Sequence, residues 1–218
     1  MGAGTPPPAA IRTAVTVPLR PEDGPARVAK LVSFDGLVDR REHVALELGR
    51  PGAVPLVRLH SECLTGDVLG SQRCDCGPQL HEAVDRVGRE GGFVLYLRQE
   101  GRGIGLYAKL EAYRLQDAGL DTYAANRALG HPEDGRDYTV AAQMLAALGV
   151  GRVRLLSNNP DKAEQLERLG VTVVERVPTG VHVTAANRRY LTAKVRHRSH
   201  VLDLAADAEV AHAAEQWS

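Results

Sequence analysis

All three cysteines of this chain fall within one short stretch, and this clustering constrains the fold more than any other feature. Cys63, Cys74 and Cys76 lie between Arg58 and Gly77 in a sequence of 218 residues. Three thiols cannot form a closed set of disulfides, and a chain of this length does not need disulfides to hold its core. The cysteines therefore have a purpose other than cross-linking the chain.

A bound metal ion is the better of two explanations for the cysteines. Thiolate is a soft ligand that suits zinc, and three protein ligands leave one tetrahedral position open for water, as in catalytic zinc sites. The alternative is that the thiols are small apolar groups in the core. Arg73, the aspartate between Cys74 and Cys76, and two glycines that mark turns indicate a polar loop and favour the metal. A fourth ligand, for example His60, would make the site structural rather than catalytic.

The composition restricts the class of protein. The formal net charge is zero and 44% of the residues are hydrophobic, which fits a compact protein with a sizeable core. Balanced charge argues against a protein that wraps nucleic acid or coats an anionic membrane. No apolar run approaches the ~20 residues of a bilayer span, and Met1 to Ala10 lacks the regions of a signal peptide. We expect a cytoplasmic protein that binds neither nucleic acid nor membrane, with reduced cysteines.

Apolar segments between turn signals predict a mixed α/β fold. Antiparallel strands are expected before the cysteine loop, and β-α units with a mixed sheet after it. The strands are expected over Val15–Val17, Val28–Phe34, His43–Leu48, Pro55–His60, Phe93–Leu97, Val153–Leu156 and Val171–Val174. The helices are expected over Pro78–Gly88, Ile104–Ala118, Tyr138–Leu148 and Asp161–Leu169, and after Asn187. The last two strands and the helix between them form a βαβ unit, which points to parallel pairing.

Two strand ends have the composition of ligand-binding loops. The strand Phe93–Leu97 runs into the glycine-rich turn 98–105, Arg-Gln-Glu-Gly-Arg-Gly-Ile-Gly, and then into a helix. Backbone N–H groups and the helix dipole at such a turn attract an anion, although short glycine motifs are common and weak evidence alone. Ser157 and two asparagines follow another strand, at the edge where open α/β sheets bind ligands.

Several motifs in colinear order, from about residue 28 to residue 200, resemble those of the GTP cyclohydrolase II family. In combination they are far more specific than any one of them. They are Arg-x-His-Ser-Glu-Cys-Leu-Thr-Gly-Asp, Ser-x-Arg-Cys-Asp-Cys-Gly-x-Gln-Leu, Arg-Gln-Glu-Gly-Arg-x-Ile-Gly-Leu, Lys-x-x-Ala-Tyr-x-Leu-Gln-Asp, Asp-x-Arg-Asp-Tyr and Leu-Leu-x-Asn-Asn-Pro-x-Lys.

The resemblance implies a homodimer that depends on zinc and magnesium and opens the imidazole ring of GTP. Its products would be formate, pyrophosphate and 2,5-diamino-6-(5-phosphoribosylamino)pyrimidin-4-one, an intermediate towards riboflavin. We expect residues 14–203 to form a single catalytic domain, with a disordered tail over 1–13 and a frayed tail over 204–218. The roughly 27 residues before the match are too few for the second enzymatic domain that is sometimes fused to this family.

The same resemblance assigns the residues of the site. Cys63, Cys74 and Cys76 match the zinc ligands, and Mg²⁺ would accompany the triphosphate. The positions that hold GTP match Arg58, Leu59, His60, Ser61, Glu62, Gln79, Glu100, Gly101, Arg102, Thr122, Ser157 and Lys162. Asp134 matches the proton acceptor, Arg136 the nucleophile at phosphorus, and Tyr113 a residue of the ring-opening steps. Because a guanidinium is a poor nucleophile until it loses a proton, Arg136 could equally act through its charge.

Two departures from the family pattern leave alternatives open. Ala124 stands where the family usually has glutamate, and Ser157 stands where threonine is common and keeps the hydroxyl. The loss of the glutamate would fit a specialised relative in secondary metabolism that stops at the formamide or uses another purine nucleotide. A zinc-stabilised nucleotide-binding module without catalysis is the alternative from a different class. Retention of Tyr113 favours complete removal of the formyl group.

Overall fold

The computed structural model describes residues 8–20, 26–132, 134–184 and 186–187, and its contacts divide the chain into two compact units. Both units are assembled from three separated segments. Unit 1 comprises Met1–Ser61, His81–Arg98 and Asp137–Thr179, and unit 2 comprises Glu62–Leu80, Gln99–Arg136 and Gly180–Ser218. The helix predicted after Asn187 and the tail predicted over 204–218 lie outside the described residues.

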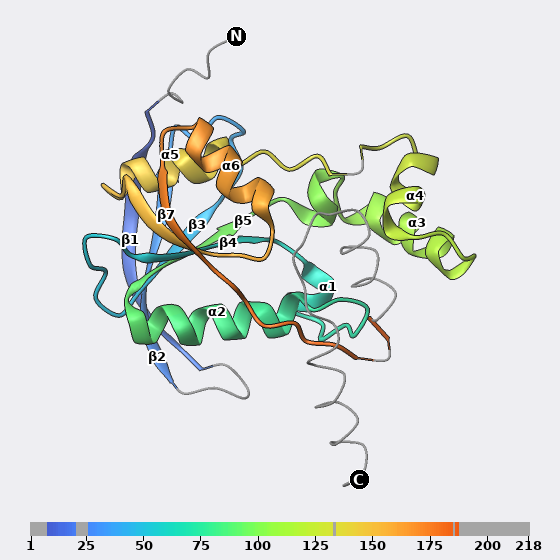
Figure 1. The fold of residues 1–218 in the computed structure, drawn as a ribbon, viewed down its shortest axis with the longest axis horizontal. Helices are drawn as coiled ribbons and strands as arrows, with labels where there is room; N and C mark the ends of the chain where they lie inside the picture. The colour runs from blue at the N-terminus through green and yellow to red at the C-terminus, as the bar shows by residue number, and fades with distance from the viewer. Residues whose placement is uncertain (1–7, 21–25, 133, 185, 188–218) are drawn as a thin grey trace, which may run out of the picture. The chain divides into compact units, whose positions relative to one another are not determined.

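Unit 1 is built on a seven-stranded mixed sheet with the order β1-β2-β3-β5-β4-β6-β7 (Figure 1). The strands are β1 (Ala10–Leu19), β2 (Arg27–Asp35), β3 (Val44–Leu48), β4 (Leu56–Ser61), β5 (Gly92–Leu97), β6 (Arg152–Leu156) and β7 (Thr172–Val177). The neighbours from β1 to β5 pair antiparallel, whereas β5, β4, β6 and β7 pair parallel. The predicted mixed sheet, with antiparallel strands first, is confirmed.

Three helices pack against this sheet. Helices α5 (Thr139–Ala147) and α6 (Pro160–Arg168) lie on one face, and α2 (Cys76–Glu90) lies along the other, its first residues belonging to unit 2 (Figure 1). Helix α6 begins where the sequence predicts because the Asn159 side chain accepts a hydrogen bond from the Asp161 N–H and a proline follows it. With β6 and β7, α6 forms the predicted βαβ unit.

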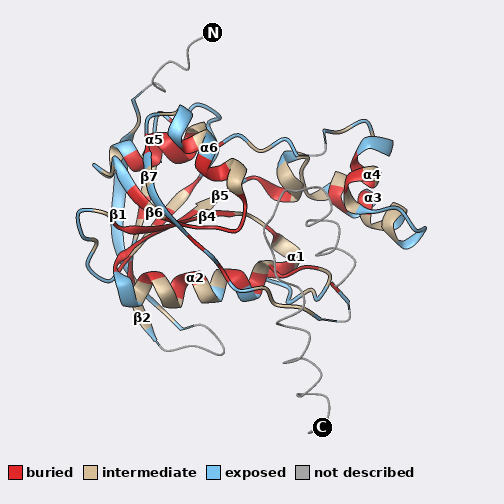
Figure 2. Cartoon of the chain, viewed as in Figure 1, coloured by how far each residue is buried: buried red, intermediate tan, exposed pale blue. Residues whose placement is uncertain are grey.

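The core lies between the sheet and these helices, and its residues are red in Figure 2. Strands β4 and β5 are buried along almost their whole length, as expected for central strands covered on both faces. Leu59, Leu95 and Leu155 have no exposed surface. At an average of about 25 cal/mol for each Å² of apolar surface removed from water, these side chains dominate the stability of unit 1.

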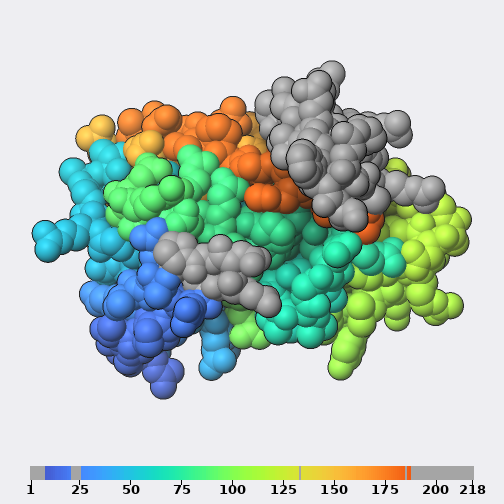
Figure 3. All heavy atoms as spheres, turned by 90° about the horizontal axis from the view of Figure 1, so that it is seen from below, coloured from blue at the N-terminus to red at the C-terminus, as the bar shows by residue number. Residues whose placement is uncertain are grey.

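Strand β1 forms one edge of the sheet and corrects the predicted N-terminal boundary. Its first residue, Ala10, pairs with Asp35 of β2, so the predicted tail over residues 1–13 overlaps an ordered strand. Most of β1 is exposed, and its residues form one blue surface with β2 in the space-filling view (Figure 3). Backbone pairing does not need buried side chains, which is why the apolar pattern underestimates the length of this strand.

In its described residues, unit 2 contains four helical elements besides the first residues of α2. They are α1 (Leu64–Asp67), the 3-10 helix η1 (Glu100–Gly103), α3 (Leu106–Asp117) and α4 (Thr122–Ala128). The sequence predicts α3, but α1 and α4 are too short to show helical periodicity. The carboxylate of Asp121 caps α4 by accepting hydrogen bonds from the N–H groups of Tyr123 and Ala124. None of the helices in the described part of the chain combines the length and apolar composition needed to cross a bilayer.

The first testable prediction concerns the close contact between β4 and β5. A Cβ added at Gly92 would lie 1.9 Å from the Leu56 carbonyl oxygen, whereas one added at Gly52 would meet nothing within 4 Å. Gly92→Ala should therefore lower the free energy of unfolding by about 2–3 kcal/mol, and Gly52→Ala should change it by less than about 0.5 kcal/mol. Denaturant unfolding of both variants measures this difference. Equal stability of the two variants would contradict the described packing.

Candidate functional site

The three cysteines form a compact cluster within unit 2. Their Sγ atoms all lie within 4.8 Å of one another, and those of Cys63 and Cys74 are 3.7 Å apart. Thiolates that bind one tetrahedral zinc at about 2.3 Å have sulfurs about 3.8 Å apart, whereas a disulfide bond needs about 2.05 Å. The donor atoms and their spacing therefore fit a zinc ion. In the described part of the chain, the cluster has these three members.

Two glycines allow the sulfur atoms to come this close. Gly66 lies in α1, where an added Cβ would be 2.8 Å from the Cys74 Sγ and 3.2 Å from the Cys63 Sγ. A Cβ at Gly77 would lie 2.5 Å from the Gly66 carbonyl oxygen. Neither glycine has a positive φ, so close approach rather than a turn requires them. The sequence predicts that these glycines mark turns. In the structure they lie in helices, and close packing is what requires them.

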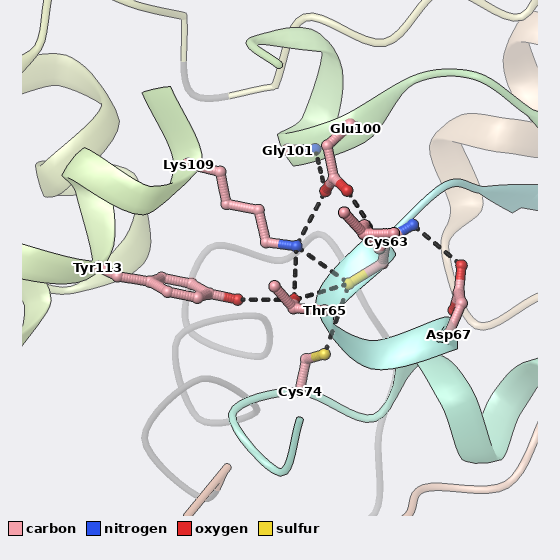
Figure 4. A network of polar contacts seen from close by, with 9 residues as sticks. Cys63, Thr65, Asp67, Cys74, Glu100, Gly101, Lys109 and Tyr113 are labelled. Atoms are coloured by element: carbon pink, nitrogen blue, oxygen red, sulfur yellow. Dashed lines mark hydrogen bonds and ion pairs between the residues drawn. The ribbon is translucent and has the colours of Figure 1, made fainter. Parts of the chain in front are cut away.

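Lys109 of α3 connects the cluster to the glycine-rich turn (Figure 4). Its Nζ donates to the Cys63 Sγ at 3.1 Å, to the Thr65 Oγ1 at 2.9 Å and to the Glu100 Oε1 at 2.9 Å. The other carboxylate oxygen of Glu100 accepts from the Leu64 N–H at 2.7 Å. The sequence gives no role to this lysine, although it opens the Lys-x-x-Ala-Tyr motif and lies one helical turn before the tyrosine.

The pKa values of the three thiols are shifted in different directions, so that Cys63 is the one that holds the negative charge. Hydrogen bonds from the Cys74 and Cys76 thiols lower the pKa of Cys63; burial opposes this shift, and the positive charge of Lys109 adds to it. The proton shared with Cys63 raises the pKa of Cys74 to about 11, and the same partner raises the pKa of Cys76. Burial disfavours the charge of Lys109, but Cys63 and Glu100 outweigh it and raise the pKa of the ammonium. The Cys63 and Lys109 pair is thus a thiolate beside an ammonium.

Tyr113 lies beside the cluster and is not a core residue. Its hydroxyl is 3.4 Å from the Thr65 Oγ1, and the Arg73 guanidinium lies over its ring, 4.4 Å from the centroid. Arg73 also forms an ion pair with Asp117 at 2.7 Å. Burial raises the pKa of Tyr113 above its ordinary value, so the phenol keeps its proton at neutral pH.

Asp134 and Arg136 form a second polar group in unit 2. The Arg136 Nε donates to the Asp134 Oδ1 at 2.8 Å, and its Nη2 donates to the Oδ2. The burial of Asp134 opposes its charge, but the hydrogen bonds from Arg136 outweigh that effect and hold the pKa of the carboxyl below its ordinary value. The two side chains therefore form an ion pair at neutral pH.

Arg102 of the glycine-rich turn lies near this pair. Its carbonyl oxygen accepts a hydrogen bond from the Gly135 N–H at 3.1 Å, and its charge also lowers the pKa of Asp134. Its guanidinium lies over the ring of the buried Tyr123, 4.4 Å from the centroid. Arg102 itself has a φ of 61°, a left-handed conformation that is costly for a residue with a side chain.

The predicted substrate residues of unit 1 gather at the carboxyl ends of two adjacent parallel strands. Arg58 of β4 donates from its Nη1 to the Leu156 carbonyl oxygen at 3.2 Å, and Lys162 donates from its Nζ to the Leu59 carbonyl oxygen at 2.7 Å. The Ser157 hydroxyl accepts from the Asn159 N–H at 3.1 Å. The structure thus brings Arg58, Ser157 and Lys162 to one edge of the sheet.

The remaining predicted residues have varied settings. Leu59 is a core side chain, and its carbonyl rather than its side chain faces the edge. His60, named above as a possible fourth metal ligand, belongs to unit 1, where its ring stacks on Tyr96. Ser61 ends β4 and Glu62 follows it, Gly101 lies in η1, and Thr122 opens α4. The Gln79 side-chain amide donates to the Asp75 carboxylate at 2.7 Å.

Comparison with known proteins identifies the family of this chain. A model of the family described as GTP cyclohydrolase II matches residues 15–178. The chain belongs to the GTP cyclohydrolase II family. It is 54% identical to GTP cyclohydrolase-2 of Vibrio cholerae over 179 residues, covering 81% of the chain and 90% of that protein. It is also 52% identical to the riboflavin biosynthesis protein RibBA of Bacillus cereus over 176 residues, 79% of the chain and 44% of that longer protein.

The second prediction follows from the Asp134 and Arg136 pair. Because the pKa of Asp134 is lower in the folded protein than in the unfolded chain, its ionised form stabilises the fold at pH values above the unfolded pKa. This stabilisation is lost as the pH falls through the folded pKa. At pH 7, Asp134→Asn should lower the free energy of unfolding by roughly 0.5–1 kcal/mol, and the difference from wild type should disappear as the pH falls below about 4.

Denaturant unfolding between pH 3 and pH 7 measures this difference. Asp35→Asn is the matched control, because the ion pair of Asp35 with Arg12 leaves 65% of the Asp35 side chain exposed and should contribute almost nothing. A stability loss in Asp134→Asn that persists unchanged at pH 3 would contradict the ion pair.

Proposed function

We propose that this chain is a zinc-dependent GTP cyclohydrolase II. It would open the guanine imidazole ring of GTP, release formate and pyrophosphate, and supply the diaminopyrimidine intermediate of riboflavin biosynthesis. The cluster of three cysteine sulfurs beside Tyr113 carries this proposal, because its spacing fits a zinc ion in a member of the GTP cyclohydrolase II family.

The cysteines and their neighbours provide the hydrolytic half of the site. When bound, zinc would supply a Lewis acid that lowers the pKa of water from its ordinary value to about 7 and so provides hydroxide at neutral pH. Cys63, Cys74 and Cys76 would hold the ion through three thiolates and leave one position for that water. Addition of water at guanine C8 breaks the ring, and hydrolysis of the resulting formamide releases formate.

Tyr113 is suited to proton transfer in these steps. Its phenol is neutral at working pH, because burial raises its pKa, and its hydroxyl lies next to Thr65 beside the cluster. The neutral phenol can donate a proton to a nitrogen of the opening ring, and the phenolate that this leaves can take a proton back during removal of the formyl group. The stacked Arg73 and its ion pair with Asp117 hold the ring in this orientation.

Cationic side chains provide the half of the site that releases pyrophosphate. Arg102 and Lys162 would neutralise the triphosphate together with Mg²⁺, and Arg136 would stabilise charge on the transferring phosphorus. The pair with Asp134 favours this electrostatic role over nucleophilic attack by Arg136. A carboxylate with a lowered pKa is a weak base, so Asp134 is better suited to orienting the guanidinium than to removing its proton.

The remaining predicted positions would bind the nucleotide, with the Arg58 guanidinium and Ser157 at the carboxyl end of β6. Glu100 has a second role in the structure, because its carboxylate accepts hydrogen bonds from Leu64, Gly101 and Lys109. We further propose that the protein forms a homodimer in the cytoplasm, where its three free thiols would stay reduced. Light scattering of the purified protein measures the size of the assembly.

A specialised relative that stops at the formamide is the second candidate. Ala124, in the first turn of α4, replaces the family glutamate, and its neighbour Tyr123 contacts Arg102 through the ring. A changed contact at this arginine could alter the choice of nucleotide. A formylated product in the assay described next would favour this candidate.

The third prediction tests the proposed reaction. Zinc-loaded protein with GTP and Mg²⁺ should yield formate, pyrophosphate and the diaminopyrimidine in equal amounts, which mass spectrometry and coupled assays measure. Cys74→Ser removes one soft ligand and should lose the metal and at least 100-fold of the activity, by analogy with the loss of one stabilising group in a catalytic site. Protein that holds zinc but leaves GTP unchanged would favour the non-catalytic module.

The fourth prediction concerns Arg136. Arg136→Lys keeps the positive charge but loses the planar fork that binds the Asp134 carboxylate, and an Arg to Lys change at such a site is not conservative. Release of pyrophosphate should fall by at least 100-fold, whereas zinc content should be unchanged. The exposed Arg114 of α3 offers a matched control, because Arg114→Lys should leave both quantities at the wild-type level. Near-normal release from Arg136→Lys would rule out both roles of this residue.

A further inference from the structure

Lys109 has no role in the proposed reaction, yet it is the most highly connected cation beside the cysteine cluster that the structure describes. Only 11% of its side chain is exposed, and lysine is seldom buried unless its charge is paired. Its Nζ has three protons, and three acceptors surround it: a sulfur, a hydroxyl and a carboxylate. The ammonium is thus oriented by all of its hydrogen bonds.

These acceptors come from two segments that flank the site. Cys63 and Thr65 belong to the loop and helix that follow β4, whereas Glu100 opens η1. Glu100 also accepts a hydrogen bond from the N–H of Leu64, the residue that follows Cys63. The contacts therefore close a ring through Cys63, Lys109, Glu100 and Leu64. Figure 4 shows the contacts of Lys109 with Cys63 and Glu100 from close by.

The ring also balances charge. Three thiolates and a divalent ion have a net charge of −1, and the Glu100 carboxylate, which pairs with the same ammonium, brings the group to −2; burial makes such an excess costly, and Lys109 lowers it to −1. The ammonium 3.1 Å from the Cys63 Sγ offsets part of this charge and draws electron density from the sulfur, so that the thiolate donates less to the metal. A metal with weaker donors is a stronger Lewis acid, and groups that contact the ligands commonly adjust a metal in this way.

We propose that Lys109 is a positioning residue that acts through Cys63: it offsets part of the negative charge of the three-thiolate centre, raises the Lewis acidity of its metal and fixes Glu100 against the same loop. This inference rests on the proposed zinc site and reaction. It assigns part of the rate of the proposed reaction to Lys109 of α3, in addition to the three cysteines.

Cobalt provides a direct measurement of this effect, because it occupies zinc sites and its bond to thiolate absorbs light. Removing the ammonium raises the energy of the Cys63 lone pairs, so the thiolate-to-cobalt charge-transfer band of Lys109→Gln should move to longer wavelength. Lys109→Met, which has no charge and no donor, should shift the band at least as far. Lys109→Arg keeps the charge and should hold the band close to its wild-type position.

Zinc affinity and kinetics complete the experiment on the full-length protein. The two neutral variants should bind zinc about 10- to 100-fold more weakly in a chelator competition. With saturating zinc, their kcat for GTP should fall while KM changes little, and Lys109→Arg should recover part of the loss. Arg114→Gln removes a positive charge from an exposed position of the same helix and should match wild type in every measurement.

The outcomes separate this inference from the proposed function. A charge-transfer band at the wild-type position in folded Lys109→Gln or Lys109→Met overturns the role of Lys109, even if wild-type protein opens GTP. Wild-type protein that binds zinc and leaves GTP intact overturns the proposed function but not the effect of Lys109 on the metal, whereas wild-type protein that binds no zinc overturns both. If one neutral variant does not fold, as circular dichroism shows, the band position of the other decides the question.

Discussion

The close approach of three cysteine sulfurs is the constraint on which the rest of unit 2 depends. Sulfurs 3.7 Å apart leave no room for a Cβ at Gly66, and the chain around them can close only because Gly77 also lacks a side chain. Concentrated thiolate charge then needs a compensating cation, which α3 supplies as Lys109. Helix α3 thus has a fixed place relative to the cysteine loop, and Tyr113, one turn further along the same helix, lies beside the cluster for the same reason.

Three parallel strands of unit 1 each end shortly before a segment that carries predicted site residues. Strand β4 ends two residues before Cys63, and β5 ends three residues before Glu100, so each of these adjacent parallel strands delivers its loop from its carboxyl end. The third parallel strand, β6, ends directly before Ser157. Because β4 and β5 are buried on both faces, their ends are held by the core and the loops begin from rigid positions.

The sequence predicts the features that depend on local patterns and fails where contacts are distant. Apolar runs and the cysteine cluster indicate the mixed sheet, the βαβ unit and the metal site. Lys109 escapes prediction because a lysine on a helix is usually exposed, and its pairing with Cys63 spans 46 residues. Helix α4 escapes because its start depends on the Asp121 cap rather than on periodicity. The first residues of β1 escape because their partner strand, and not their own side chains, makes them a strand.

Tyr123, next to Ala124 in α4, holds the side chain of Arg102 in place. In this chain Arg102 packs against the ring of Tyr123, which is buried and therefore rigid. An aromatic ring binds the flat face of a guanidinium and leaves its N–H edge available for acceptors. The ring therefore keeps Arg102 oriented at its strained backbone position without competing with a phosphate for the same hydrogen bonds.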